Sequence, residues 1–373
     1  MQVRHWDEVT GESLEAAITE FGAHPEVRSL LLLLGEEDLP GSDRLDAVLQ
    51  AAPLPIVGGV FPRVLLGERM SARGGVLVGL PAPLQAAIVP QLSGDPASFA
   101  APLDAALAGS EPEGRTVLVF FDATAAHVDA MLGTLFELVG SLGGYLGGGA
   151  GSLSFAPMPS VVSNDGLLQD AAVVAVVDLA CSVGVAHGWD AVGSPVSVTS
   201  AAGRRIASLD HRPAADVYLE RVQSHAGTVE FDEFARLAGS YPLGIVQLDG
   251  ELVVRDPVVR DGDALLCVGE VAEGAFVRLM YGDASSLLAA ASHAASKARS
   301  GDGAGELALV FDCISRVLYL DERFAEELDR LDFDSPRVGA ATIGEVCNPG
   351  DRYLELYNKT VVAGVLRSLV PDG

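Results

Sequence analysis

Cysteine and long apolar runs are both scarce in this chain, and their scarcity argues against a disulfide-rich or membrane-spanning protein. The 373 residues hold four cysteines, Cys181, Cys267, Cys313 and Cys347, with no CxxC spacing. This pattern excludes a disulfide scaffold and predicts reduced intracellular thiols. No apolar run reaches the ~20 residues of a membrane span, and no basic start followed by an apolar stretch opens the chain. We expect a soluble, cytoplasmic protein.

Basic residues are scarce as well. Lysine and arginine number 24 against 51 acidic residues, a formal net charge of −27, and Lys297 and Lys359 are the only lysines. A charge of this sign repels phosphate backbones and anionic lipid heads, so we expect no nucleic-acid or membrane partner. An acidic chain with little lysine suits a halophilic habitat, where salt screens the self-repulsion. The alternative explanation is the codon bias of a GC-rich genome.

Recognisable catalytic and metal-binding patterns are missing too. The seven histidines show no HxH or HExxH spacing, and the chain has no GxSxG motif and no Walker lysine. The glycine-rich stretch 147–152 follows a predicted helix, whereas a dinucleotide-binding loop lies between a strand and a helix. We expect no metal, no cofactor and no assembled catalytic site.

Strand-like and helix-like segments alternate along the chain. Continuous apolar runs predict buried strands at Ser29–Leu34 and Thr116–Phe121. Apolar residues at helical spacing predict a helix over Val128–Val139, and an alanine-rich helix is predicted over Asp283–Arg299. Near the C-terminus, Tyr353–Val362 is predicted to be one strand. The pattern predicts an α/β fold of mixed β-sheets packed with helices.

A pattern of strand, helix and turn glycine occurs three times. The strand centre precedes the glycine by 26, 28 and 29 positions, in the pairs Leu32 and Gly58, Phe120 and Gly148, and Val310 and Gly339. The similar spacing indicates related supersecondary units. The alternative is that any strand–helix–strand unit needs about 30 residues.

Two segments carry residues suited to a binding pocket. His187 and Trp189 follow an apolar stretch and provide a polar group beside a flat apolar wall, or else a packing cluster at a strand end. Arg316 follows a predicted buried strand, where its planar guanidinium suits a ligand carboxylate or, equally, a structural ion pair. Cys313 nearby is either a buried structural thiol or a reactive one.

Small polar residues near other predicted strand ends are further candidates. Glu345, Asn358 and Thr360 lie among apolar residues, where polar groups cost free energy unless they form hydrogen bonds. They are therefore either structural links or ligand contacts. Gly148 and Gly149 allow backbone amides to approach an anionic ligand closely, or simply allow a tight crossing of segments.

The chain resembles the FIST family of intracellular signal-transduction proteins over nearly its whole length. The segments that carry the resemblance are GYLGGGAGS (144–152), AHGWDAVGSPVSVTSAAGRRIASLDHRPAADVY (186–218), LALVFDCISR (307–316) and VGAATIGEV (338–346). The resemblance implies two related halves, a FIST N-terminal domain at residues 1–208 and a FIST C-terminal domain at 209–373. It also implies a sensory module that binds small ligands such as amino acids.

Two departures from the family pattern remove side chains that would contact a ligand. The first turn is PIVGGVFPRVLLGE, where family members more often have a GCSTxGE-like string with a cysteine and a serine. The glycine stretch is GGGAGS, where an acid often follows the glycine.

These observations predict a standalone cytoplasmic sensory protein, not an enzyme, that binds an amino-acid-like metabolite and signals to a partner protein in trans. The predicted ligand-binding residues come from both halves, which must meet at one cleft: Gly148, Gly149, His187, Trp189, Arg316, Glu345, Asn358 and Thr360. Two alternatives are an enzyme acting on an amino-acid-like or acyl substrate, through Cys313 or an acid/base pair, and a protein-interaction scaffold similar to F-box relatives.

Overall fold

The apolar runs of the sequence form the central strands of the fold. Ser29–Gly35 (β2), Thr116–Asp122 (β8) and Leu307–Cys313 (β21) are buried along their whole length. The computed structural model describes residues 1–107, 113–141, 143–227, 234–247, 250–301, 305–348 and 353–369. Within these residues the chain forms mixed sheets packed with helices, which confirms the predicted α/β fold.

Each central strand pairs in parallel with the strand that follows its helical connection. The partners are Ile56–Phe61 (β3) for β2, Gly144–Ala150 (β9) for β8 and Arg337–Thr342 (β22) for β21. The paired Cα positions include Leu32 with Gly58, Phe120 with Gly148 and Val310 with Gly339. The recurring sequence spacing is therefore a strand register, and it relates three units rather than two halves.

The three units contain equivalent elements in the same order. Unit 1 comprises β1 (Gln2–Trp6), α1 (Gly11–Ala23), β2, α2 (Ser42–Gln50), β3, β4 (Arg63–Leu66), β5 (Arg69–Ser71) and β6 (Gly75–Leu80). Unit 2 comprises β7 (Leu84–Pro90), η1 (Pro96–Ser98), α3 (Ala100–Leu107), β8, α4 (Val128–Val139), β9, β10 (Val161–Ser163), β11 (Gly166–Leu168) and β12 (Ala171–Val177). Unit 3 comprises β13 (Leu179–Ala186), α7 (Ala284–Arg299), β21, α8 (Ile314–Leu320), η3 (Asp321–Arg323), α9 (Phe324–Arg330), β22, β23 (Glu345–Asn348), β24 (Glu355–Tyr357) and β25 (Val361–Ser368).

The units exchange hairpins in a cycle. Their own strands lie in the orders β1-β6-β2-β3, β7-β12-β8-β9 and β13-β25-β21-β22. Hairpin β4–β5 of unit 1 then extends the sheet of unit 3, β10–β11 of unit 2 extends that of unit 1, and β23–β24 of unit 3 extends that of unit 2. Two of these sheets thus contain strands from both sides of residue 208, and a domain division at that residue stays a prediction.

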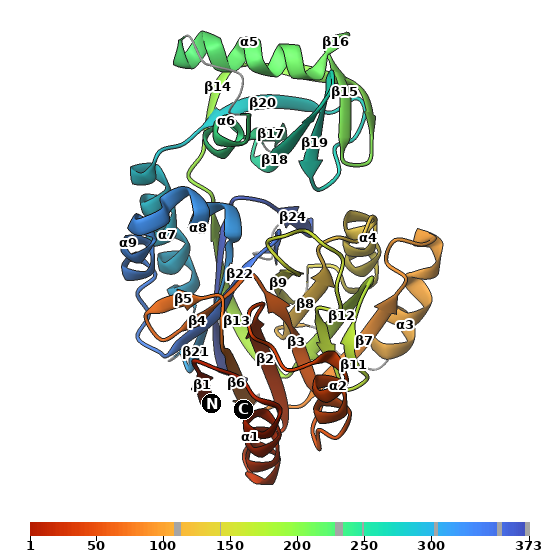
Figure 1. Ribbon diagram of the computed structural model, residues 1–373, viewed down its shortest axis with the longest axis vertical. Helices are drawn as coiled ribbons and strands as arrows, with labels where there is room; N and C mark the ends of the chain where they lie inside the picture. The colour runs from red at the N-terminus through yellow and green to blue at the C-terminus, as the bar shows by residue number, and fades with distance from the viewer. Residues whose placement is uncertain are drawn as a thin grey trace.

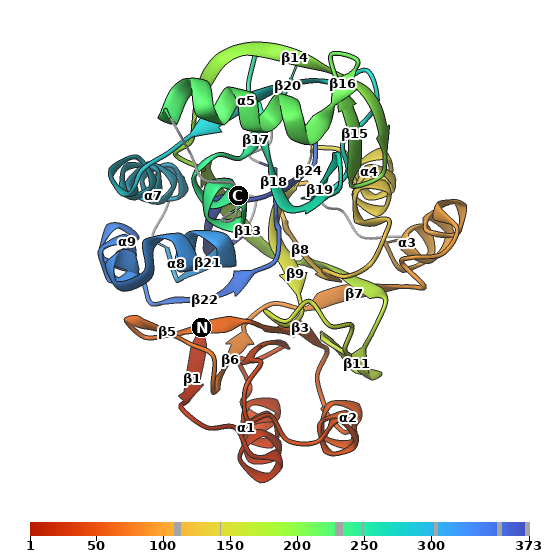
Figure 2. The same ribbon diagram turned by 45° about the horizontal axis from the view of Figure 1, so that its top comes forward.

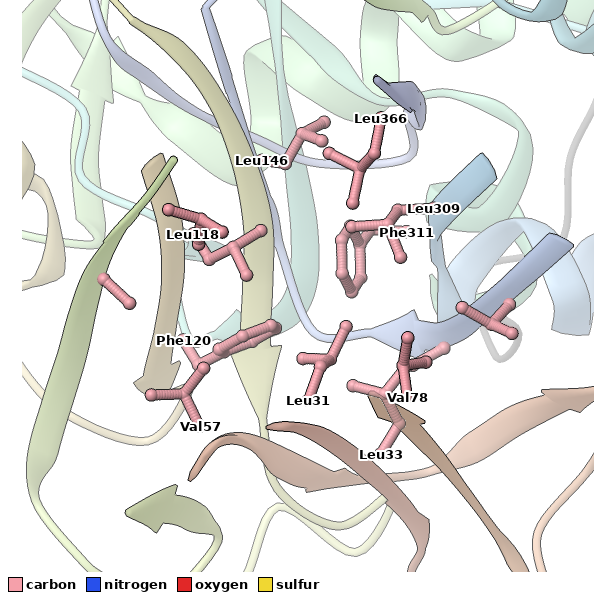
Figure 3. Packing of buried hydrophobic residues seen from close by; sticks show 14 of the residues in the cluster. Leu31, Leu33, Val57, Val78, Leu118, Phe120, Leu146, Leu309, Phe311 and Leu366 are labelled. Carbon is pink, nitrogen blue, oxygen red and sulfur yellow. The ribbon is translucent and has the colours of Figure 1, made fainter. Parts of the chain in front are cut away.

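Strand alternation directs one face of each sheet to a common core. Leu31 of β2, Phe120 of β8 and Phe311 of β21 point toward one another between the sheets (Figure 3). The ring centroid of Phe120 lies 5.7 Å from that of Phe311 and 6.1 Å from that of Phe61, in edge-to-face contacts. The outward faces pack on helices: α1 and α2 on unit 1, α3 and α4 on unit 2, and α7 to α9 on unit 3.

A smaller lobe interrupts unit 3 between β13 and α7, and it stands above the body in Figure 1. Its elements are β14 (Asp190–Ala202), β15 (Arg205–Leu209), β16 (Arg212–Pro213), α5 (Ala214–Ala226), α6 (Phe234–Ser240), β17 (Leu243–Val246), β18 (Leu252–Asp261), β19 (Ala264–Val268) and β20 (Phe276–Tyr281). These strands form one sheet, and α5 lies across its outer face (Figure 2).

Strand β18 joins the lobe to the body. Its Val253 and Val254 are buried in the apolar cores of the body. Its Arg255 donates a 2.7 Å hydrogen bond to the Leu356 carbonyl of β24 and lies 3.3 Å from Asp129 of α4. The lobe is therefore anchored along β18 by apolar burial and by a buried cation.

Candidate functional site

The lobe and the body border an open cavity of about 440 Å³ where α6 and β18 face α8. Its lining residues are Ala238, Gly239 and Ser240 of α6, Asp256 and Val258 of β18, Ser315, Leu318 and Tyr319 of α8, and Lys359 from the turn before β25. Most of the lining surface is apolar, while Asp256 and Lys359 place opposite charges on one wall. A cavity of this size, with few converging polar groups, is typical of a small-molecule site.

Asp256 holds the polar wall together. Its Oδ2 lies 3.1 Å from Lys359 Nζ and accepts a 3.0 Å hydrogen bond from Ser315 Oγ. Lys359 Nζ also donates to the Gly239 carbonyl at 3.1 Å and lies 5.6 Å from the ring centroid of Trp189. Within the described residues, no hydrogen bond to Asp256 Oδ1 accompanies the two contacts of Oδ2.

The turn that carries Lys359 corrects a prediction. One strand over Tyr353–Val362 is wrong, because β24 ends at Tyr357 and β25 begins at Val361. Lys359 lies between them with a φ of +51°, a left-handed conformation that residues other than glycine seldom adopt. The turn removes Lys359 from the sheet and places its ammonium group at the cavity.

His187 and Trp189 lie behind the polar wall. Trp189 is buried, contacts Tyr319 edge to face at 5.7 Å between ring centroids, and has the Lys359 ammonium over its ring. His187 Nδ1 accepts a 2.9 Å hydrogen bond from the backbone N–H of Trp189. Burial and the nearby Arg316 guanidinium lower the pKa of His187 to about 4, so this imidazole is neutral at pH 7.

Arg316 is the centre of a buried ion cluster and does not line the cavity. Its Nε and Nη2 donate to Glu327 Oε1 at 2.9 and 2.6 Å, and Nε lies 3.1 Å from Asp312 Oδ1. Nη1 donates to the His187 carbonyl at 2.5 Å, and Nη2 also donates to the Leu287 carbonyl at 3.1 Å. All three guanidinium nitrogens therefore bind protein groups. The structural ion pair, rather than the clamp for a ligand carboxylate, describes this residue.

Glu345 belongs to a second buried polar cluster. Its Oε1 accepts a 3.0 Å hydrogen bond from Thr342 Oγ1, and its Oε2 accepts the Thr360 backbone N–H at 3.4 Å. Burial raises the pKa of Glu345 well above its ordinary value. Burial and Glu345 also raise the pKa of Cys313, so this thiol stays protonated and is unsuited to nucleophilic attack.

The remaining predicted residues lie around Glu345. Gly148 is its Cα partner across the β9–β23 pair, and the Gly149 N–H donates to the Gly344 carbonyl at 2.9 Å. The Gly149 amide is therefore used within the protein. Thr360 Oγ1 donates a hydrogen bond to the Asn358 carbonyl. The side-chain amide of Asn358 donates to the Tyr357 carbonyl.

A comparison of the three units shows where polar groups have replaced apolar ones. Val64 of the first hairpin pairs with Ala340, Val161 of the second with Gly59, and Glu345 of the third with Gly148. Equivalent outward positions of the central strands are Leu34, Phe121 and Asp312. All six side chains are buried, and the two in unit 3 are carboxylates. Buried carboxylates are costly, so Asp312 and Glu345 need the hydrogen bonds and the cation that surround them.

The structure brings the predicted residues together, but as a layer behind the cavity. Arg316 binds the His187 carbonyl, and His187 and Trp189 are joined by a hydrogen bond. None of the eight predicted residues is among those lining the cavity in the described part of the chain. Two lining residues, Ser315 and Lys359, are sequence neighbours of predicted ones. The rarity of lysine was the available signal for Lys359, whereas Asp256 had none.

Among the described helices, none is both long and apolar enough to cross a membrane. Fold and site together define a class: a three-unit α/β protein with an inserted lobe and a polar cavity at the junction between lobe and body.

Comparison with known families then identifies the chain. Residues 29–212 match the FIST N domain and residues 214–348 match the FIST C domain. The chain therefore belongs to the FIST family, a family of sensory and signal-transduction domains, as the sequence motifs indicated. No curated protein matches the chain at a significant level.

Proposed function

We propose that this chain is a sensory protein that binds a small amino-acid-like ligand in the cavity between lobe and body. The carrying observation is the pair of opposite charges on one wall, Lys359 Nζ and Asp256, at 3.1 Å from each other. A ligand carboxylate would bind Lys359, and a ligand ammonium would bind Asp256 Oδ1. Val258, Leu318 and the ring of Tyr319 would contact the ligand side chain.

The proposed sensory role includes a partner protein, a location in the cell and the absence of catalysis. A partner protein in trans would receive the signal. A cytoplasmic location is supported by the four free cysteines, three of which are buried as thiols. A non-enzymatic role is supported by the raised pKa of Cys313, which works against the alternative of a cysteine nucleophile.

A thermal-shift screen of amino acids and related metabolites tests the proposal, because a ligand that binds only the folded form raises the melting temperature. We expect at least one zwitterionic compound to stabilise the protein. Lys359→Met should weaken its binding by roughly 2–5 kcal/mol, since truncation leaves the partner charge buried and unpaired.

A matched control uses an ion pair of the same lobe that lies outside the cavity. Arg205 Nε and Asp261 Oδ2 are 2.8 Å apart, and both side chains are about half exposed. Arg205→Met should leave ligand affinity unchanged. Failure of every compound to stabilise the protein would refute the ligand proposal and favour a scaffold. Turnover of an acyl substrate that Cys313→Ser abolishes would instead show an enzyme.

A further inference from the structure

Lys359 contacts three parts of the structure at once. Its Nζ lies 3.1 Å from Asp256 of β18, donates to the Gly239 carbonyl of α6 at 3.1 Å and lies over the ring of Trp189. Trp189 stands at the start of the lobe, one residue before β14, and its ring fills the space where Gly282 lacks a Cβ, one residue after β20. One ammonium group thus connects the cavity, the helix over it and both chain crossings to the lobe.

The bond to Gly239 has a specific effect on α6. Gly239 lies in the last turn of this helix, Phe234–Ser240, where backbone carbonyls lack an intrahelical N–H partner. A cation at this end also stabilises the helix dipole. Lys359 therefore helps to hold α6 against β18 and α8, the elements on which it packs.

The placement of Lys359 is built into the fold. Its left-handed φ of +51° costs free energy that the surrounding contacts must offset, and such conformations gather at functional positions. Its side chain is only 2% exposed, so a ligand in the cavity would meet an ammonium already committed to protein acceptors. A ligand carboxylate could bind it only by competing with Gly239 and Asp256.

We propose that Lys359 is the residue through which the cavity reports its occupancy: a ligand carboxylate draws Nζ away from the Gly239 carbonyl and releases the C-terminal end of α6. The change is then passed to the crossings at Trp189 and Gly282, which carry the lobe. This inference rests on the proposed function and names how its site is regulated.

Hydrogen exchange of α6 and fluorescence of Trp189 test this proposal. Trp6 is the other tryptophan of the chain, so Trp6→Phe makes the emission specific to Trp189. The probes are acetate, which offers only a carboxylate, methylammonium, which offers only a cation, and glycine, which offers both. We expect acetate and glycine to change the emission and speed α6 exchange, and methylammonium to do neither.

Variants separate the contact to α6 from the ligand. Lys359→Met should speed exchange of α6 by roughly tenfold without ligand, the effect of losing one charged hydrogen bond, and should abolish the response to acetate. Lys359→Arg, which keeps a cationic donor, should retain much of the protection. Arg205→Met is the control and should exchange like the unmodified protein.

The outcomes are distinct. If glycine raises the melting temperature while α6 exchange and Trp189 emission stay unchanged, the role of Lys359 is overturned and the ligand site stands. If α6 exchange in Lys359→Met equals that of the control, the role of Lys359 is overturned as well. If none of the screened compounds stabilises the protein, the proposed function fails, and the regulation that rests on it fails too.

Discussion

Removal of the Arg316 guanidinium should be among the most damaging single changes in this protein. Arg316→Leu leaves Glu327 and Asp312, both fully buried, without the cation that lies 2.6 and 3.1 Å from them. It also removes the donors to the His187 and Leu287 carbonyls, which come from separate segments of unit 3. The variant keeps a side chain of moderate size, so the main loss is electrostatic.

The expected loss is about 3–5 kcal/mol of unfolding free energy, the range for breaking a buried ion pair on one side. Domains have stabilities of about 5–15 kcal/mol, so such a loss is a large fraction of the total. Urea unfolding measures it through the midpoint and slope of the transition. Arg323→Leu is the matched control, because Arg323 forms an ion pair with Glu326, three residues further along the chain, and both side chains are about half exposed. The control should differ little from the unmodified protein.

Two further measurements test the reasoning itself. Arg316→Leu combined with Glu327→Leu should recover part of the loss, because the second change removes a stranded buried charge. The loss should also be smaller at about pH 5 than at about pH 8, since protonation neutralises the Asp312 carboxylate that has lost its cation. Burial and Glu327 already raise the pKa of Asp312 well above its ordinary value. A loss below about 1 kcal/mol, independent of pH, would refute the assignment of Arg316 as a structural cation.

Three other predictions concern stability. Burial raises the folded-state pKa of Glu345, so the contribution of this residue to folding stability is present below the unfolded pKa and is lost as pH rises. The Tm of Glu345→Gln relative to the unmodified protein should therefore increase with pH. A constant difference in Tm would contradict this. Gly58→Ala should severely destabilise the fold, because the new Cβ would meet the Leu32 carbonyl oxygen at 1.8 Å. Gly133→Ala, at an exposed and open position of α4, should instead stabilise the protein by about 0.5–1 kcal/mol. Equal urea midpoints for the two variants would refute the close approach of Gly58 to Leu32. The net charge of −27 should make the Tm rise steeply from dilute buffer to molar KCl, and a flat profile would favour codon bias as the reason for the missing lysines.

The predictable part of this fold is its local part. Continuous apolar runs predicted β2 and β8, helical spacing predicted α4, and an alanine-rich segment predicted α7. The strand that failed, Tyr353–Val362, did so because one residue adopts a left-handed φ, which apolar patterning does not reveal. The threefold spacing was visible in the sequence, but it gave no information on which sheet each hairpin would join.

The candidate site shows a similar limit. Arg316, Glu345, His187 and Trp189, which the sequence motifs singled out, gather at the end of unit 3. The motifs did not reveal that other residues line the cavity, because the lining depends on partners from distant segments. Arg316 looked equally suited to a ligand carboxylate and to a protein one. Only the arrival of Glu327 and Asp312 at its nitrogens decides between them.

By itself, then, the amino-acid sequence determined the α/β class, the positions of the central strands, the recurring spacing that indicated related units and the membership of the FIST family. Periodicity and local motifs are carried by neighbouring residues, so these features need no tertiary information. The tertiary structure decided the cyclic exchange of hairpins and the cavity between lobe and body. It alone brought Asp256 to Lys359, because the lobe folds back on the body through β18 and places residues about a hundred positions apart at one wall.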